Sequence, residues 1–277
     1  INMNKQLLAA LLILGAAVSF TSCNQNKTQE VDEENAIVLT DSLKEEAKEL
    51  LRTVQVERMA LMSEIEVTDN GVRLVPVKFF LPLEAADKAQ TNYQRAQLIG
   101  MYLADKNCDE MTFAAKNNAA ERDAVIAKLA AETNSKMDIL ATDSIKDMTR
   151  DQMIEKTNAI ALAGIEEALN SDNADEALVT LTYAVIEGTL NKLAVADLLG
   201  EYDQQEVFKS ILTHKSMLSN IVELHKILSP AYTSLGEMSE LVAKIDAVTQ
   251  ADETRVDGAL LAFITYCKEH RGAIAPY

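Results

Sequence analysis

The chain has 277 residues, of which 48% are hydrophobic but only 5% are aromatic, and it contains no Trp. Its 43 Asp and Glu residues outnumber its 26 Lys and Arg residues, which gives a formal net charge of −17 at pH 7. Nucleic acids and anionic lipid surfaces attract proteins through basic patches, so this acidity excludes nucleic acid as an expected partner and favours solubility or a basic partner.

The first segment of the chain has the pattern of a secretory signal peptide. Lys5 is the only charge before an unbroken apolar run from Leu7 to Val18, and small residues follow up to Cys23. The run is too short for a stable transmembrane helix, which needs about 20 apolar residues, so we expect a cleaved signal rather than a permanent anchor. Met3 is interpreted as the initiator, so the two residues before it are expected to carry no function.

The end of this segment resembles a lipobox, the site of lipoprotein signal peptidase. In Thr21-Ser22-Cys23 small residues precede a Cys whose thiol would take the diacylglyceryl group, although Phe20 replaces the usual Leu. We expect lipidation at Cys23 and a membrane partner through the N-terminal lipid, with ordinary cleavage beside a coincidental Cys as the alternative. Asn24 replaces the Asp typical of inner-membrane lipoproteins, which favours the outer membrane facing the periplasm and leaves surface exposure open.

These features divide the chain into three parts. Residues 1–22 are the upstream residues and lipoprotein signal peptide, residues 23–40 form a polar, acidic tether, and residues 41–277 form a single helical domain. Without Lys5 the mature chain has 25 basic and 43 acidic residues, a formal charge of −18. Abundant Ala, Leu, Glu and Lys with only four Pro favour an all-α fold.

Helical periodicity covers most of the predicted domain. A first helix is expected over 41–63, followed by a turn at Asn70-Gly71. Residues 72–83 contain two Pro, so we expect an extended strap against the helices, with a short hairpin as the alternative. Further helices are predicted over 84–105, 109–132, 143–170, 174–199, 203–228, 230–249 and 251–270.

Two of these helices are apolar on nearly every face. The segment 174–199 is the clearer case, and Ile160–Ile165 gives the helix over 151–170 a similar character. Helices of this kind lie at the centre of a fold. The predicted fold class is therefore an irregular all-α multi-helix bundle with two central apolar helices and one extended Pro-containing strap, most buried from Leu181 to Val195.

Metal and cofactor chemistry finds little support in the sequence. His214 and His225 share the apolar face of one predicted helix but lie about 16 Å apart along its axis, too far to bind one ion, so hydrogen-bonded core histidines are expected. The motifs of di-iron, zinc, haem, serine-hydrolase and phosphate-loop sites do not occur. We expect no metal, no cofactor and no catalytic residue, and leave open a disulfide between Cys108 and Cys267.

Glu187-Gly188 is the most unusual feature of the predicted domain. A carboxylate stands inside an apolar helix beside a Gly that lowers helix stability by about 1 kcal/mol. A buried carboxylate needs a partner or a raised pKa, and such groups gather at functional sites. We expect Glu187 to be buried within hydrogen-bonding distance of a Tyr, Lys or Arg. A purely structural pair, with Gly188 permitting a close helix crossing, is the alternative.

A second candidate patch contains Tyr102 and Asp105, which share a helix face. Together with Tyr93 and Tyr183 they either line a polar pocket or anchor ordinary core hydroxyls to carboxylates. The candidate binding residues are therefore Glu187, Tyr183, Tyr102 and Asp105.

Both patches resemble an uncharacterised family of all-helical lipoproteins of the Bacteroidetes. The segment 97–105, QLIGMYLAD, is similar to that family's Gly-x-Tyr-x-x-Asp helix. The segment 183–188, YAVIEG, is similar to its Gly-Gly-Trp-Ile-Glu-Gly helix, with Tyr-Ala-Val in place of Gly-Gly-Trp. The resemblance implies an all-α envelope protein of unknown activity.

The expected function is that of a membrane-anchored, non-enzymatic envelope lipoprotein that binds a partner protein or a small ligand. One alternative is an enzyme with a buried carboxylate site around Glu187. The other is an outer-membrane nutrient-binding lipoprotein, a class usually rich in aromatic sugar platforms, whereas this chain has no Trp.

Overall fold

The structure is a computed structural model that describes residues 38–63, 67–68, 71–72, 79–111, 119–133, 145, 147–199 and 201–275. The helices are α2 (Asp41–Ser63), α3 (Asn92–Met111), α4 (Ala119–Glu132), α5 (Arg150–Asn170), α6 (Ala174–Leu199), α7 (Glu201–Thr213), α8 (Lys215–Leu228), α9 (Ser239–Gln250) and α10 (Val256–Ile274). The predicted all-α fold class is confirmed. Cys23 and the rest of residues 1–37 lie outside the described residues, as do residues 73–78 of the predicted strap.

Short elements connect some of these helices. Two 3-10 helices, η3 (Leu83–Lys88) and η5 (Thr233–Met238), precede α3 and α9. The two-residue strands β1 (Val67–Thr68) and β2 (Gly71–Val72) pair antiparallel, with Val67 opposite Val72. They precede the segment 72–83 for which the strap or hairpin was predicted, and share only Val72 with it. No helix within the described ranges is long and apolar enough to cross a membrane.

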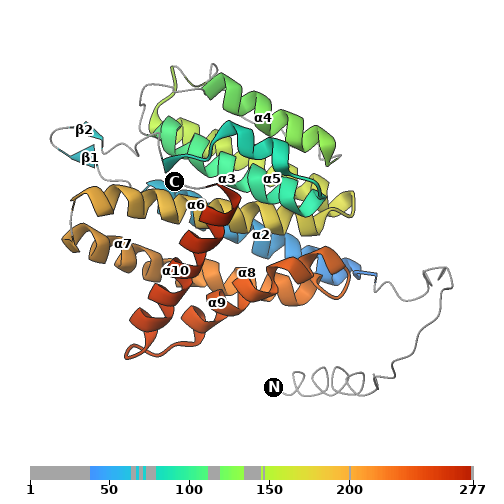
Figure 1. Ribbon diagram of the computed structural model, residues 1–277. Coiled ribbons are helices and arrows are strands. Elements are labelled where there is room, and N and C mark those ends of the chain that lie inside the picture. Colours follow the sequence, from blue (N-terminus) through green and yellow to red (C-terminus); the bar gives the residue numbers. More distant parts are fainter. Residues whose placement is uncertain are drawn as a thin grey trace, which may run out of the picture. The chain divides into compact units, whose positions relative to one another are not determined.

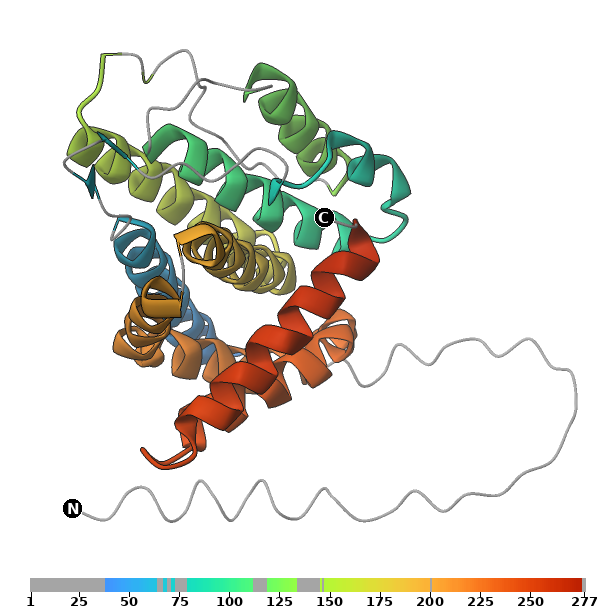
Figure 2. The same cartoon turned by 60° about the vertical axis from the view of Figure 1, so that its left-hand side comes forward.

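Helix α6 occupies the centre of the bundle. It contacts α2, α3, α5, α7, α8 and α10, which surround it in Figures 1 and 2. Every side chain from Leu178 to Ala194 is buried, because the helix is apolar on nearly all faces. The predicted burial maximum is confirmed over Leu181–Ala194, and the side chain of Val195 lies outside the described part.

The second central helix is α3, and the prediction that 151–170 is central was wrong. In α5 only Met153, Ile165 and Leu169 are buried. In α3 the residues from Ala96 to Glu110 are buried apart from Leu103. Apolar periodicity missed this because the second half of α3 is polar and is enclosed only through ion pairs. Lys106 bonds to Glu110 at 2.5 Å and to Asp123 of α4 at 2.8 Å.

A glycine lets α3 and α6 approach each other backbone to backbone. A Cβ atom on Gly100 would lie 2.2 Å from the carbonyl oxygen of Thr180 and 3.0 Å from the amide nitrogen of Ala184. The hydroxyl of Thr180 donates to the carbonyl oxygen of Ala96 at 3.2 Å, which fixes the crossing. At Gly188 the close neighbour is a side chain, because a Cβ there would lie 2.7 Å from Sδ of Met62 in α2.

Several predicted helix boundaries were wrong because local caps start the helices later. The predicted helix 84–105 is divided into η3 and α3, since the Thr91 hydroxyl accepts from the amide of Gln94 and the Gln94 side chain accepts from the amide of Thr91. Thr149 and Gln152 form the same capping box at the start of α5, which replaces the predicted start at 143. The Thr-x-x-Gln spacing was the signal that marks both boundaries.

Two other predicted helices are also divided. The predicted helix 203–228 breaks at His214, which stands between α7 and α8, and the predicted helix 230–249 begins as η5 before α9. The predicted helix 251–270 is α10, which begins later at Val256 and continues to Ile274. The first part of the predicted helix 109–132 belongs to the end of α3, and α4 begins at Ala119.

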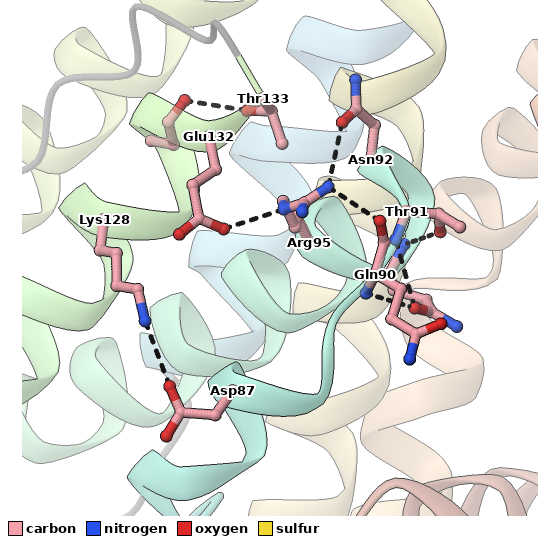
Figure 3. A network of polar contacts seen from close by, with 10 residues as sticks. Asp87, Gln90, Thr91, Asn92, Arg95, Lys128, Glu132 and Thr133 are labelled. Carbon is pink, nitrogen blue, oxygen red and sulfur yellow. Dashed lines mark hydrogen bonds and ion pairs between the residues drawn. The ribbon is translucent and has the colours of Figure 1, made fainter.

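Ion pairs fasten α4 to η3 and to the start of α3 (Figure 3). Nε of Arg95 lies 3.0 Å from Oε2 of Glu132, and Nζ of Lys128 lies 3.1 Å from Oδ1 of Asp87. Thr133 follows the last residue of α4, and its hydroxyl donates to the carbonyl oxygen of Ala130 at 3.0 Å. These contacts hold α4 beside the first turns of α3.

Candidate functional site

Glu187 forms a fully enclosed ion pair with Arg271 of α10. Their side chains are each 1% exposed, and Nε of Arg271 lies 3.0 Å from both carboxylate oxygens. Nη1 of the same guanidinium donates to the carbonyl oxygen of Ala275 at 2.7 Å, and Nη2 donates to that of Phe79 at 3.4 Å. The prediction that Glu187 is buried beside a Tyr, Lys or Arg is confirmed. The pair ties α6 and α10 to residues 79–83, the described end of the predicted strap, which is called the strap from here on.

Asp105 and Tyr102 of α3 also bond to the strap. The Asp105 carboxylate accepts from the Asn191 side chain at 2.8 Å and from the amide of Leu81 at 2.7 Å. The Tyr102 hydroxyl donates to the carbonyl oxygens of Pro82 at 2.8 Å and Leu83 at 3.2 Å. Both side chains are 0% exposed, so they anchor the strap inside the core.

Burial changes the protonation of both carboxyl groups. Desolvation raises the pKa of Glu187 to about 8, the nearby Asp105 raises it further, and Arg271 opposes the shift. Desolvation also raises the pKa of Asp105 to about 6, against the bonds donated by Asn191 and by the amide of Leu81. A carboxyl group with a raised pKa binds its proton more tightly in the folded state, so its contribution to stability is lost as the pH rises through the folded pKa.

We therefore expect the stability of Glu187→Gln relative to wild type to increase from about pH 5 to about pH 8.5, because ionising the buried Glu187 destabilises only the wild type. At the acidic end the two proteins should be nearly equal, since protonated Glu and Gln have similar shapes. Urea unfolding across this range measures the difference. Comparing the two proteins cancels His270, whose pKa is lowered by burial. A difference that does not change with pH contradicts the expectation.

Tyr183 belongs to a separate chain of hydrogen bonds between α3, α6 and α10. Its hydroxyl lies 3.0 Å from the hydroxyl of Tyr93 and 3.0 Å from Nε2 of His270, which also lies 2.8 Å from Nε2 of Gln97. The His270 ring stacks on the Tyr183 ring at 5.7 Å. Tyr183 and Tyr93 therefore contact each other and His270, and neither bonds to Tyr102 or Asp105, so the four residues do not share one set of hydrogen bonds.

The candidate binding residues thus divide into two groups, both enclosed. Glu187 and Asp105 lie near each other with Tyr102 beside the strap, while Tyr183 lies in the hydrogen-bond chain with Tyr93. None of these four residues lines the cavity between α3 and α5.

A cavity of about 100 Å³ lies between α3 and α5 over α6 and the second half of α2. Apolar side chains of α3, α5 and α6 line the cavity. The lining includes Ile99, Leu103, Ile160, Ile165, Leu181 and Ala184. Sequence reasoning missed this cavity. The available signal was the row of small residues Ala161, Gly164 and Ala168 on one side of α5, which leaves room where larger side chains would fill the space.

The cavity has polar ends. Gln55, Arg58, Lys106, Asn107 and Glu110 lie at the end near the C-terminal half of α3. Asn173, Glu176 and Ser171 lie at the opposite end, near the start of α6. Burial raises the pKa of Glu176 to about 7, and Asp175 adds to the shift. An elongated ligand with an apolar body and polar termini matches this distribution.

Arg58 is the least compensated of the polar groups in the cavity wall. It is 3% exposed, and its Nε and Nη2 both donate to Oε1 of Gln55 at 3.2 Å. Nη2 also lies 3.3 Å from Sδ of Met59, whereas Nη1 has no hydrogen-bond partner within the described ranges of the chain. Desolvation lowers the pKa of Arg58 to about 10, so the guanidinium stays charged at neutral pH.

Other buried cations near this region have carboxylate partners. Lys106 bonds to Glu110 and Asp123, and Nη1 of Arg122 lies 3.4 Å from Oδ2 of Asp109. Among the residues that the structure describes, no acidic side chain forms an ion pair with Arg58. The difference matters because an unpaired charge inside a protein costs several kcal/mol.

His225, Cys108 and Cys267, which could in principle bind a metal or be oxidised, are all engaged in the packing of the fold. Nε2 of His225 lies 3.0 Å from the carbonyl oxygen of Leu235. Cys108 and Cys267 are buried free thiols whose pKa values are raised by burial. In the part of the chain that the structure describes, no three His, Cys, Asp or Glu side chains form a group that could hold a metal ion.

Comparison with protein-family models, with curated proteins and with solved structures finds no match for this chain.

Proposed function

We propose that this protein is a lipid-anchored envelope protein that acts by binding rather than catalysis, and that a small ligand occupies the cavity between α3 and α5. The cavity itself carries the proposal, because apolar walls with a few polar groups at the ends are the usual form of a small-molecule site. The signal-like N-terminus and the resemblance to helical envelope lipoproteins support the location.

An enzyme built around Glu187 has less support. The carboxylate is 0% exposed and is held by Arg271, and it is absent from the cavity lining. A substrate would have to displace a buried ion pair to reach it. The apolar cavity therefore favours the binding function over the catalytic one.

The anchor is tested at Cys23. We expect Cys23→Ser to remain unprocessed or to appear in the soluble fraction, because serine lacks the thiol that takes the lipid. Intact mass of the wild-type protein from membranes should show a lipidated N-terminal Cys23, and density-gradient fractionation should place it in the outer membrane. A mature N-terminus without lipid contradicts the anchor, and recovery with the inner membrane contradicts the outer-membrane location.

The binding function is tested by filling the cavity. A Cβ atom on Gly164 would meet no heavy atom within 4 Å, so Gly164→Leu should fold and should project into the cavity. We expect this variant to lose affinity for octanoate and octan-1-ol by about tenfold or more, because the added side chain occupies their volume. Saturation-transfer NMR titrations measure both ligands.

The matched control is Gly258→Leu in α10, an exposed glycine with no heavy atom within 4 Å of its Cβ position. It should bind both compounds as the wild type does. The proposed function is wrong if neither compound binds the wild type, or if both bind Gly164→Leu with unchanged affinity.

A further inference from the structure

The charge of the ligand can be inferred from Arg58, and the inference rests on the proposed function. Arg58 is a lining residue of the cavity, and among the residues that the structure describes its Nη1 has no hydrogen-bond partner. Buried donors are nearly always paired, so an unpaired one that lines a cavity indicates a missing acceptor.

We propose that the cavity binds a monoanionic amphiphile, an alkyl carboxylate, whose carboxylate pairs with Arg58 and whose chain lies between α3 and α5. A carboxylate supplies both things that Arg58 lacks, an acceptor for Nη1 and a neutralising charge. Oε1 of the neighbouring Gln55 already accepts hydrogen bonds from Nε and Nη2 of Arg58. The position of this amide is fixed in turn, since Nε2 of Gln55 donates to Oδ1 of Asn158 at 2.9 Å.

The charge balance at this end of the cavity favours a single negative charge. Lys106, the other cation in the wall there, is already bonded to two carboxylates, those of Glu110 and Asp123. Of the cations that line this end of the cavity in the described helices, Arg58 is therefore the one without a carboxylate partner. A dianion such as a phosphate monoester would bring a second charge toward Glu110, which also lines the cavity, so repulsion opposes it.

The shape of the cavity favours an unbranched apolar chain. From Ala184 to Glu176 the lining residues of α6 extend about 12 Å along the helix axis, a length suited to a chain of medium size. Between these ends the walls are mostly Ile, Leu, Ala and Gly residues, with the hydroxyl side chains of Thr157 and Thr180 among them. Partly exposed residues of α5, among them Ala161 and Gly164, leave a route of entry from that side.

The test compares three compounds of one chain length, octanoate, octan-1-ol and octylammonium, by NMR titration of the full chain at neutral pH. We expect octanoate to bind about tenfold or more tightly than octan-1-ol, and octylammonium to bind most weakly. This comparison uses the wild type alone, so it does not depend on how a variant folds.

Arg58→Met then assigns the preference to one side chain. It should lower the affinity for octanoate by about tenfold or more and leave octan-1-ol unchanged. Without ligand its melting temperature should equal or exceed that of the wild type, because an uncompensated buried charge has been removed. Arg52→Met is the matched control, since Arg52 lies in the same helix, pairs with Glu166 at 3.7 Å and is not part of the cavity wall.

The outcomes separate the two proposals. If octan-1-ol binds as tightly as octanoate and Gly164→Leu blocks both, the cavity is a binding site but Arg58 does not select an anion, and the inference fails alone. If octanoate is preferred equally by the wild type and Arg58→Met, the inference also fails. If no compound binds, the proposed function fails with it.

Discussion

Gly100→Ala should destabilise the domain by roughly 1–3 kcal/mol, although it adds a single methyl group. Helix propensity alone would make the Gly100→Ala variant more stable than the wild type by about 1 kcal/mol, because Ala favours the helix interior over Gly. The methyl carbon would lie 2.2 Å from the carbonyl oxygen of Thr180, however, and a backbone atom of a central helix cannot turn aside as a side chain can. The two most buried helices must therefore separate, and loss of packing along their interface outweighs the propensity gain.

Two other glycines serve as controls for Gly100→Ala in urea unfolding. Gly258→Ala meets no heavy atom within 4 Å and should stabilise the protein by up to about 1 kcal/mol. Gly188→Ala meets only the side chain of Met62, which is flexible and can move, so its effect should fall between the other two. Equal stabilities for Gly100→Ala and the wild type contradict the close crossing of α3 and α6.

Arg271→Met should destabilise the protein by about 3–5 kcal/mol at neutral pH. The substitution keeps an apolar chain of comparable length but removes every donor that holds Glu187 and the carbonyl oxygens of Ala275 and Phe79. Without the guanidinium, which opposes the rise in the pKa of Glu187, the carboxyl group stays protonated in the core and loses its hydrogen-bond donor. The strap and the end of α10 also lose their common attachment.

The control for Arg271→Met is Lys128→Met, which breaks an exposed ion pair with Asp87. Exposed pairs are weak, so this change should alter stability by less than about 1 kcal/mol. Urea unfolding followed by circular dichroism compares both variants with the wild type. If Arg271→Met loses no more stability than Lys128→Met, the buried pair is not what holds the strap.

The helical class and the central position of α6 could be predicted from the sequence. A segment that is apolar on nearly every face can be stable only when it is surrounded, so composition alone determines the environment of residues 174–199. The same reasoning placed Glu187 inside the core and required a partner for it. The bounds of α2 and α6 also agree with the predicted ranges 41–63 and 174–199.

The sequence could not identify the partners, because these depend on which helices meet. Glu187 and Arg271 are 84 positions apart, and several acidic and basic residues could have formed that pair. The sequence also indicated α5, and not α3, as the second central helix, because the burial of α3 depends on which helices it meets. Polar residues in the second half of α3 are enclosed only when a neighbouring helix supplies the opposite charges, as Asp123 of α4 does for Lys106.

By itself, then, the sequence determined properties that follow from one segment at a time: helix formation, the burial of α6 and the need to compensate Glu187. Only the tertiary structure decided the properties that belong to the space between segments. The cavity exists because the small residues of α5, such as Gly164, lie opposite α3. Arg58 lacks a counter-charge because no acidic side chain of the described helices pairs with it. Packing is a relation among distant residues, and periodicity along one helix contains no information about it.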